Sequence, residues 1–245
     1  MRIYVQAHDK GIHLIEAYQL LFNKYWAVTQ PVTILGYAKP DFELAPNFSF
    51  VSLGEDKGPK IGGDLIDFFS GIEDEHLIYT VYSQLIIRPV LTQLLEYMAC
   101  LIERSDRVGR IALTGDMEVN QPYSLMRLAE SSLAEHSQTS NAKLSAIWSM
   151  WSKGYFLKHM EPDWDLWQWE TEGSERAKMD GVQILSNTGK YPITCCRVYK
   201  RGLPHAGSFR GWDKHRQAMT QEDQAVVRPI MRGTAWQEAE GYVAH

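Results

Sequence analysis

Glu170 follows a tryptophan-rich, acidic stretch that could carry catalytic chemistry. Trp164, Trp167 and Trp169 precede it. A carboxylate set among aromatic rings is partly desolvated, which suits it to act as a general base, and the faces of Trp167 and Trp169 could stack on sugars or bases. The alternative is that the tryptophans fill the core and that Glu170 is a solvated acid favoured by a helix dipole. Glu172 competes for the role of base.

A glycine-rich loop at 54–63 could bind a phosphate. It carries Lys57 and Lys60, and Asp64 is expected to cap the helix that follows. Two ammonium groups, free backbone N–H groups and a helix N-terminus together suit an anion. The spacing matches neither Gly-x4-Gly-Lys-Ser/Thr nor Gly-x-Gly-x-x-Gly. An exposed loop with lysines for solubility is the alternative interpretation.

Polar residues follow three of the predicted strands. Ligands bind at the carboxyl ends of the strands in open α/β sheets, so these side chains could contact a base, a ribose or an acceptor. Dipeptides such as His-Asp and Gly-Asp are also typical of turns, and both interpretations stay open. The strand-end residues are Ala7, His8, Asp9, Tyr82, Ser83, Gln84 and Asp116.

The chain beyond residue 200 is basic and aromatic. Arg210 and Trp212 lie in a stretch where basic and aromatic residues alternate irregularly. Such a stretch could contact a nucleic-acid backbone and stack on bases. It could equally be a solvated surface strip.

The composition of the chain and the absence of common catalytic motifs argue against several classes of function. A net charge of -5 gives no global attraction to nucleic acid or anionic membrane. No stretch approaches the length of a bilayer span and the N-terminus has no long apolar segment, so we expect a cytoplasmic protein, in the host cytoplasm if it is viral. The three cysteines are expected to be reduced thiols. Gly-x-Ser-x-Gly, His-Glu-x-x-His and a ligand-spaced histidine cluster are all absent from the sequence.

Alternating strand and helix patterns predict an α/β fold with a mixed, mostly parallel central sheet. We expect one Rossmann-related domain over residues 1–200 and an irregular basic extension over 201–245. Residues 131–139 favour no element. Strands are expected at 2–7, 32–36, 48–53, 77–81, 110–114, 142–150, 182–185 and 194–199, and helices at 14–26, 64–72, 91–102, 155–160 and 221–227.

Several short stretches of the chain stand out as motifs: Gly-Tyr-Ala-Lys-Pro at 36–40, Ser-Leu-Gly-Glu-Asp-Lys-Gly-Pro-Lys at 52–60, Ile-Tyr-Thr-Val at 78–81 and Ile-Arg-Pro-Val at 87–90. Together with a block at 167–181, they resemble GT-A type nucleotide-diphospho-sugar glycosyltransferases of a phage and bacterial group. The most specific is Trp-Gln-Trp-Glu-Thr-Glu-Gly-Ser-Glu-Arg-Ala-Lys-Met-Asp-Gly at 167–181. The likeness covers about residues 1–200 and implies a GT-A-like domain.

The resemblance also implies roles for individual residues. Residues 7–9 would face the nucleotide, Lys60 and Asp64 would lie near the sugar diphosphate, and Arg176 and Lys178 would line the donor side. Glu170 would be the catalytic base, with Asp180 as a second catalytic candidate in the same block. The implied donor is a nucleotide sugar, a UDP-sugar first of all. The acceptor is a hydroxymethylated pyrimidine in phage DNA or, alternatively, a polysaccharide or lipid-linked sugar.

One departure concerns the metal. GT-A enzymes place an Asp-x-Asp or Asp-Asp pair after the strand at 77–81, because two carboxylates hold the Mg²⁺ or Mn²⁺ that neutralises the leaving diphosphate. This chain has Tyr82-Ser83-Gln84 there. Two alternatives follow: basic residues replace the metal in an active enzyme, or the chain only binds a nucleotide sugar. We expect the former, with no metal ligand.

Overall fold

The structure, a computed structural model, describes residues 1–26, 29–56, 58–115, 124–128, 131–200, 203–204 and 219–231. The chain divides into two compact units. The first contains residues 1–4, 53–80 and 91–192, and the second contains residues 5–52, 81–90 and 193–245. Strands β1 (Arg2–Gln6) and β4 (His76–Val81) begin in the first unit and end in the second.

The first unit is built on a mixed sheet. From β4 its strand order is β9 (Ser149–Ser152), β6 (Val108–Ala112), β10 (Gln183–Gly189), β8 (Ser131–Glu135) and β7 (Ser124–Leu128). Strand β9 is antiparallel to both β4 and β6, so these two run in one direction, and β10 is parallel to β6. Strand β8 is antiparallel to β10 and to β7. Most strands of this unit therefore share one direction.

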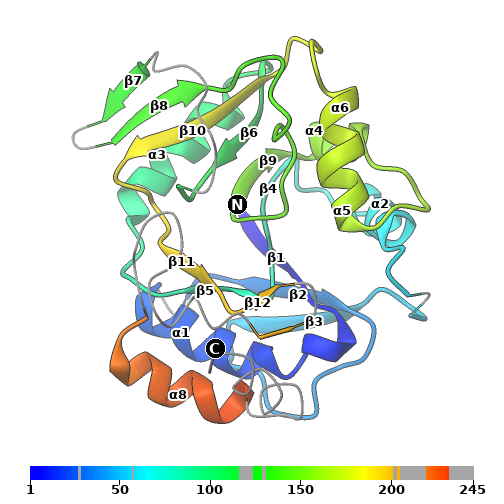
Figure 1. The fold of residues 1–245 in the computed structure, drawn as a ribbon, viewed down its shortest axis with the longest axis vertical. Coiled ribbons are helices and arrows are strands. Elements are labelled where there is room, and N and C mark those ends of the chain that lie inside the picture. Colours follow the sequence, from blue (N-terminus) through cyan, green and yellow to red (C-terminus); the bar gives the residue numbers. More distant parts are fainter. Residues whose placement is uncertain are drawn as a thin grey trace, which may run out of the picture. The chain divides into compact units, whose positions relative to one another are not determined.

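The helices of the first unit are short apart from two. They are α2 (Gly62–Ser70), α3 (Thr92–Glu103), α4 (Lys153–Lys158), α5 (Leu166–Gln168) and α6 (Ser174–Arg176), with the π-helix η2 (Trp169–Gly173) between the last two. Figure 1 shows α4, α5 and α6 close together, with α2 beside them. Buried aromatic rings, among them Phe69, Tyr79, Trp151 and Phe156, form the core beneath them.

The second unit contains parallel strands β2 (Val32–Gly36) and β3 (Phe48–Ser52), which pair with Val32 opposite Phe48. Helix α1 (Leu14–Tyr25) buries Leu14, Tyr18 and Phe22, whose spacing gives the helix one apolar face. The other elements are the 3₁₀ turn η1 (Asp9–Gly11), β5 (Gln84–Ile86), β11 (Cys195–Arg197), β12 (Tyr199–Lys200), β13 (Leu203–Pro204) and α8 (Gln221–Met231). Helix α8 packs on α1 (Figure 1).

The predicted α/β class with a mixed, mostly parallel sheet is confirmed. Two local predictions are wrong. Residues 142–148 form no strand, and only β9 follows them. Asp64 does not cap α2, because the helix begins at Gly62 and Asp64 lies inside its first turn. The expected helix at 221–227 is present and continues to Met231. None of the helices in the described ranges combines the length and hydropathy that a bilayer span requires.

Candidate functional site

The ends of three strands meet in the second unit. The N–H of Ala7, just after β1, donates to the carbonyl of Leu35 in β2 at 2.8 Å. The N–H of Tyr82, just after β4, donates to the carbonyl of Gln6 at 2.9 Å. The predicted strand-end residues 7–9 and 82–84 are therefore brought together at one edge of this unit, the position at which open α/β sheets bind ligands.

His8 and Asp9 shape the turn at that edge. The Asp9 Oδ1 atom accepts from the N–H of Ala38 at 3.0 Å, which ties the turn after β1 to the residues after β2. The Nδ1 atom of His8 accepts from the N–H of Lys10 at 3.2 Å and caps η1. Both side chains stay partly exposed. The turn interpretation is thus correct, and it leaves both side chains accessible to a ligand.

Tyr82 lies across the turn η1. A Cβ atom on Gly11 would stand 2.1 Å from the Cε2 atom of Tyr82, so only glycine allows this close approach. Burial, and then the neighbouring Tyr199, raise the pKa of the Tyr82 hydroxyl above its ordinary value. The hydroxyl is therefore uncharged at neutral pH.

The residues after β4 do not fit a hard divalent cation. Ser83 is buried and its carbonyl accepts from the N–H of Val198 at 2.9 Å. Gln84 is buried in β5, and its Oε1 atom accepts from the thiol of Cys195 at 3.5 Å. Mg²⁺ and Mn²⁺ prefer carboxylate oxygens, which this turn lacks. Among the described residues, no three His, Cys, Asp or Glu side chains are grouped to hold a metal ion.

The N-terminus of α2 is occupied by protein groups. The N–H of Gly62 donates to the carbonyl of Trp164, and that of Gly63 donates to the carbonyl of Pro162, both at 2.9 Å. The expectation that these N–H groups are free for a phosphate is therefore wrong. Lys60 remains exposed at the start of the helix. Any anion bound here would depend on side-chain cations rather than on the first turn of α2.

Glu170 lies in the π-helix η2 within a continuous helical run from Leu166 to Arg176. The run begins with a capping box between Asp165 and Gln168. The Oε1 atom of Glu170 accepts from the N–H of Ala146 at 2.5 Å. The side chain is half-buried, and the contact with Ala146 uses only one of its two carboxylate oxygens. Single π-turns within α-helices often mark functional positions.

The tryptophans near Glu170 divide between core and surface. Trp169 is 1% exposed and its ring packs 4.9 Å from that of Phe156 and 5.3 Å from that of Trp151, so it belongs to the core. Trp164 is buried beneath the guanidinium of Arg176, 4.4 Å from the ring centre. Trp167 is 66% exposed. Of the two rings expected to stack on an acceptor, only that of Trp167 is open to solvent in the described structure.

The two predicted donor-side cations already have acidic partners. Arg176 pairs with Glu161, and the Nζ atom of Lys178 lies 2.6 Å from Glu175 Oε1. These pairs lie at the surface, where they contribute little stability and can exchange for a ligand. Both cations therefore remain candidates for donor contacts.

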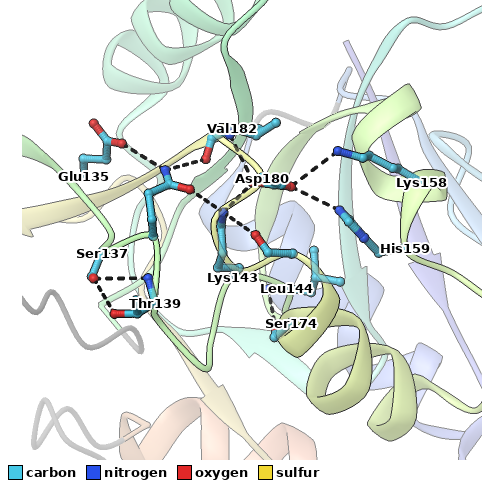
Figure 2. Close-up of polar contacts among 12 residues, drawn as sticks. Glu135, Ser137, Thr139, Lys143, Leu144, Lys158, His159, Ser174, Asp180 and Val182 are labelled. Carbon is cyan, nitrogen blue, oxygen red and sulfur yellow. Dashed lines mark hydrogen bonds and ion pairs between the residues drawn. The ribbon is translucent and has the colours of Figure 1, made fainter.

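Asp180 is enclosed by basic side chains (Figure 2). Its carboxylate lies 2.7 Å from the Nζ atom of Lys143, 3.2 Å from His159 Nε2 and 3.6 Å from Lys158 Nζ. Burial alone would raise the pKa of Asp180, but the hydrogen bonds from Lys143 and from the N–H of Val182 outweigh burial and hold it below its ordinary value. Asp180 is therefore ionised at neutral pH.

Four predicted site residues lie outside the described residues: Lys57, Asp116, Arg210 and Trp212. Sequence reasoning missed Lys143 and Ser174, which hold the segment beside Glu170. The one available signal was a lysine within a run of small and apolar residues, which is where a buried, paired charge would stand.

No protein-family model and no curated protein sequence matches the chain. Its structure is similar to that of Staphylococcus aureus TarS, with 10% identity, a TM-score of 0.47 and coverage of 79% of this chain and 36% of TarS. It is also similar to the mannosyltransferase PcManGT from Pyrobaculum calidifontis, determined with GDP-Man and Mn²⁺, with 15% identity, a TM-score of 0.48 and coverage of 94% and 68%. An active-site mutant of LgtC gives 12% identity, a TM-score of 0.39 and coverage of 73% and 65%. The chain spans only part of each of these proteins.

Proposed function

We propose that the protein is a glycosyltransferase that moves a sugar from a nucleoside-diphosphate sugar, a UDP-sugar first of all, to an acceptor hydroxyl. The observation that carries the proposal is the placement of Glu170, a half-buried carboxylate oriented by a backbone N–H in a π-turn. The GT-A resemblance of residues 167–181 assigns the same residue the role of base. Within the second unit, the strand-end turn holds His8, Asp9 and Tyr82, for which the resemblance implies donor contacts.

In an inverting reaction, Glu170 would deprotonate the acceptor hydroxyl as the diphosphate leaves. The Glu170 carboxylate takes the proton of the acceptor hydroxyl while that oxygen bonds to the anomeric carbon. The bond from the anomeric carbon to the diphosphate breaks, and its electron pair leaves with the diphosphate. Because the turn after β4 does not fit a metal, we assign the neutralisation of this charge to basic side chains, with Lys60 as the exposed candidate and Lys57 as a second.

Replacing Glu170 tests the proposal. Glu170→Gln keeps the side-chain shape and an acceptor for the N–H of Ala146, but it cannot take a proton. We expect transfer to fall about 100-fold or more, with the Kd for UDP-glucose unchanged in calorimetry. The control is Glu172→Gln, because Glu172 lies exposed in the same π-turn and should be dispensable. Equal activity of Glu170→Gln and wild type would rule out Glu170 as base.

The absence of a fitting metal clamp gives a second measurement. Donor hydrolysis with UDP-glucose should persist in EDTA, since basic side chains rather than a metal ion are proposed to neutralise the leaving diphosphate. Complete loss in EDTA with recovery on adding Mn²⁺ would contradict this part of the proposal. Tight donor binding without turnover across many nucleotide sugars would instead favour a non-catalytic binding protein.

The acceptor remains part of the proposal, with two candidates. Arg210 and Trp212 motivate hydroxymethylated DNA, which a salt-dependent gel shift with modified duplex would test. Exposed Trp167 favours an uncharged polysaccharide or lipid-linked acceptor, because Asp163 and Glu172, which are near it in sequence, are exposed and would repel a phosphate backbone. Transfer to an oligosaccharide without any DNA shift would decide for the second candidate.

A further inference from the structure

The segment 143–146 forms neither helix nor strand, yet it is fixed by contacts from residues 170–180. The Nζ atom of Lys143 donates to the carbonyl of Ala177 and to Asp180 Oδ1, each at 2.7 Å. The N–H of Leu144 donates to Ser174 Oγ at 2.9 Å. Figure 2 shows the Lys143, Leu144, Ser174 and Asp180 side of this arrangement. In the last contact of the series, the N–H of Ala146 donates to the Oε1 atom of Glu170.

Protein groups already occupy both carboxylate oxygens of Asp180, so the side chain cannot contact a substrate. Its side chain is 8% exposed, its Oδ1 atom also accepts from the N–H of Val182 at 3.0 Å, and its Oδ2 atom faces His159 and Lys158. The partner Lys143 is 1% exposed and also donates to Gln138 Oε1 at 3.0 Å. A group enclosed in this way cannot exchange a proton with an acceptor. It can hold backbone in place.

We infer that Asp180 and Lys143 are positioning residues for Glu170. Their buried ion pair, with Ser174, fixes the segment 143–146, so that the N–H of Ala146 holds one carboxylate oxygen of Glu170 and leaves the other for the acceptor. The guanidinium of Arg110 also supports the segment, since it donates to the carbonyl of Lys143 at 3.1 Å. The inference rests on the proposed function in taking Glu170 as the base.

A loosened segment would misplace Glu170 rather than remove it. Small displacements of a catalytic group cost about 100-fold in rate. Asp180→Asn should therefore lower kcat about 10- to 100-fold and leave the KM for the donor unchanged. Ser174→Ala removes a single hydrogen bond of the same series and should lower kcat less. It also serves if Asp180→Asn does not fold.

Double variants give the decisive test of whether Asp180 and Ser174 act through Glu170. In a Glu170→Gln background, Asp180→Asn or Ser174→Ala should cause no further loss of kcat, because the group they position is already gone. Losses that multiply would overturn the inference, as would a raised donor KM with unchanged kcat. Ser131→Ala is the control in the same unit: it removes the buried hydrogen bond to Asn187 and touches none of the residues 143–180. It should retain wild-type kcat.

A second readout needs no activity. Hydrogen exchange of the Ala146 amide should accelerate in Asp180→Asn and Ser174→Ala and stay at the wild-type rate in Ser131→Ala. Unchanged exchange in both variants would overturn the inference even if transfer falls. If the wild-type protein transfers no sugar at all, the proposed function fails, and the exchange rates still decide whether Asp180 holds the segment.

Discussion

At the scale of single residues, His136 is a histidine kept neutral inside the first unit. It is 2% exposed, and its Nε2 atom lies 2.5 Å from Ser186 Oγ. Burial first, and then the nearby charges of Arg110 and Lys143, lower its pKa from 6.5 to about 4. The same two cations that support the segment 143–146 thus also disfavour a charge on His136.

This pKa predicts a loss of stability in mild acid. Between pH 6.5 and about 4 the unfolded chain takes up a proton that folded His136 does not, so the free energy of unfolding decreases as the pH falls. The contribution reaches about 3 kcal/mol at most. In His136→Gln, urea unfolding at pH 7 and pH 5 should differ less than in wild type. The free energy of unfolding of His136→Gln should still depend on pH to some extent, since burial lowers the pKa of His159 as well. The same pH dependence of the free energy of unfolding in both proteins would contradict the prediction.

At the scale of elements, the π-helix η2 depends on a glycine. A Cβ atom on Gly173 would lie 2.7 Å from Leu144 Cδ1 and 3.1 Å from the carbonyl oxygen of His159. The helix can approach the segment 143–146 closely enough for the Ser174 and Glu170 contacts only because this side chain is absent. Close approach, rather than backbone freedom, explains the glycine.

Gly173→Ala should therefore destabilise the protein by about 1–3 kcal/mol and lower transfer together with it. The matched control is Gly154→Ala in α4, where a new Cβ atom would meet nothing within 4 Å. Alanine there should be neutral or should stabilise by up to about 1 kcal/mol, because it favours helix. Thermal unfolding of the two variants compares them directly. A Gly173→Ala variant as stable as Gly154→Ala would exclude the close approach.

The local hydrophobic pattern predicted most elements of this fold. It failed where contacts with residues distant in sequence determine the conformation. The apolar spacing of α1 and α3 and the β-branched runs of β1, β2 and β4 each specify their element. In contrast, Leu144, Ala146 and Trp148 alternate like a strand although residues 142–148 form none. The backbone N–H groups of Leu144 and Ala146 are instead bound by the side chains of Ser174 and Glu170, 30 and 24 positions away. No local pattern contains that information.

The candidate site was predictable in its residue types but not in their surroundings. Glu170, Trp167 and the turn at residues 7–9 could be chosen from the sequence. Trp169 belongs to the core because its ring packs on those of Trp151 and Phe156. Carbonyls of residues 162 and 164 occupy the first N–H groups of α2, although these segments are about 100 residues apart. Tertiary contacts of this kind require the folded chain.

At the scale of the whole molecule, the chain passes between its two units at five points, all within described residues. The second unit is therefore assembled from three separate stretches. Its last stretch supplies α8, which is anchored by Asp223: the carboxylate lies 2.7 Å from Lys24 Nζ and 2.6 Å from the Tyr25 hydroxyl. Val227 and Met231 are buried on the same helix.

The expected boundary at residue 200 can be tested with fragments. A fragment of residues 1–200 lacks α8 and should melt at a lower temperature than the full chain, since burying side chains such as Val227 and Met231 stabilises by about 1.5–3 kcal/mol each. A fragment of residues 1–231 keeps α8 and should melt at a higher temperature than the fragment of residues 1–200. If both fragments have the same Tm, α8 is dispensable and residues 1–200 are an independent domain.

Lys143 also has a chemical consequence for experiments on this protein. All three of its ammonium protons are directed to acceptors on Gln138, Ala177 and Asp180, and the side chain is closed off from solvent. Amine-reactive reagents should modify the exposed lysines within minutes and leave Lys143 untouched while the first unit stays closed. The extent of Lys143 acylation, measured by mass spectrometry, would then report how frequently the first unit opens around Lys143, with no label engineered into the chain.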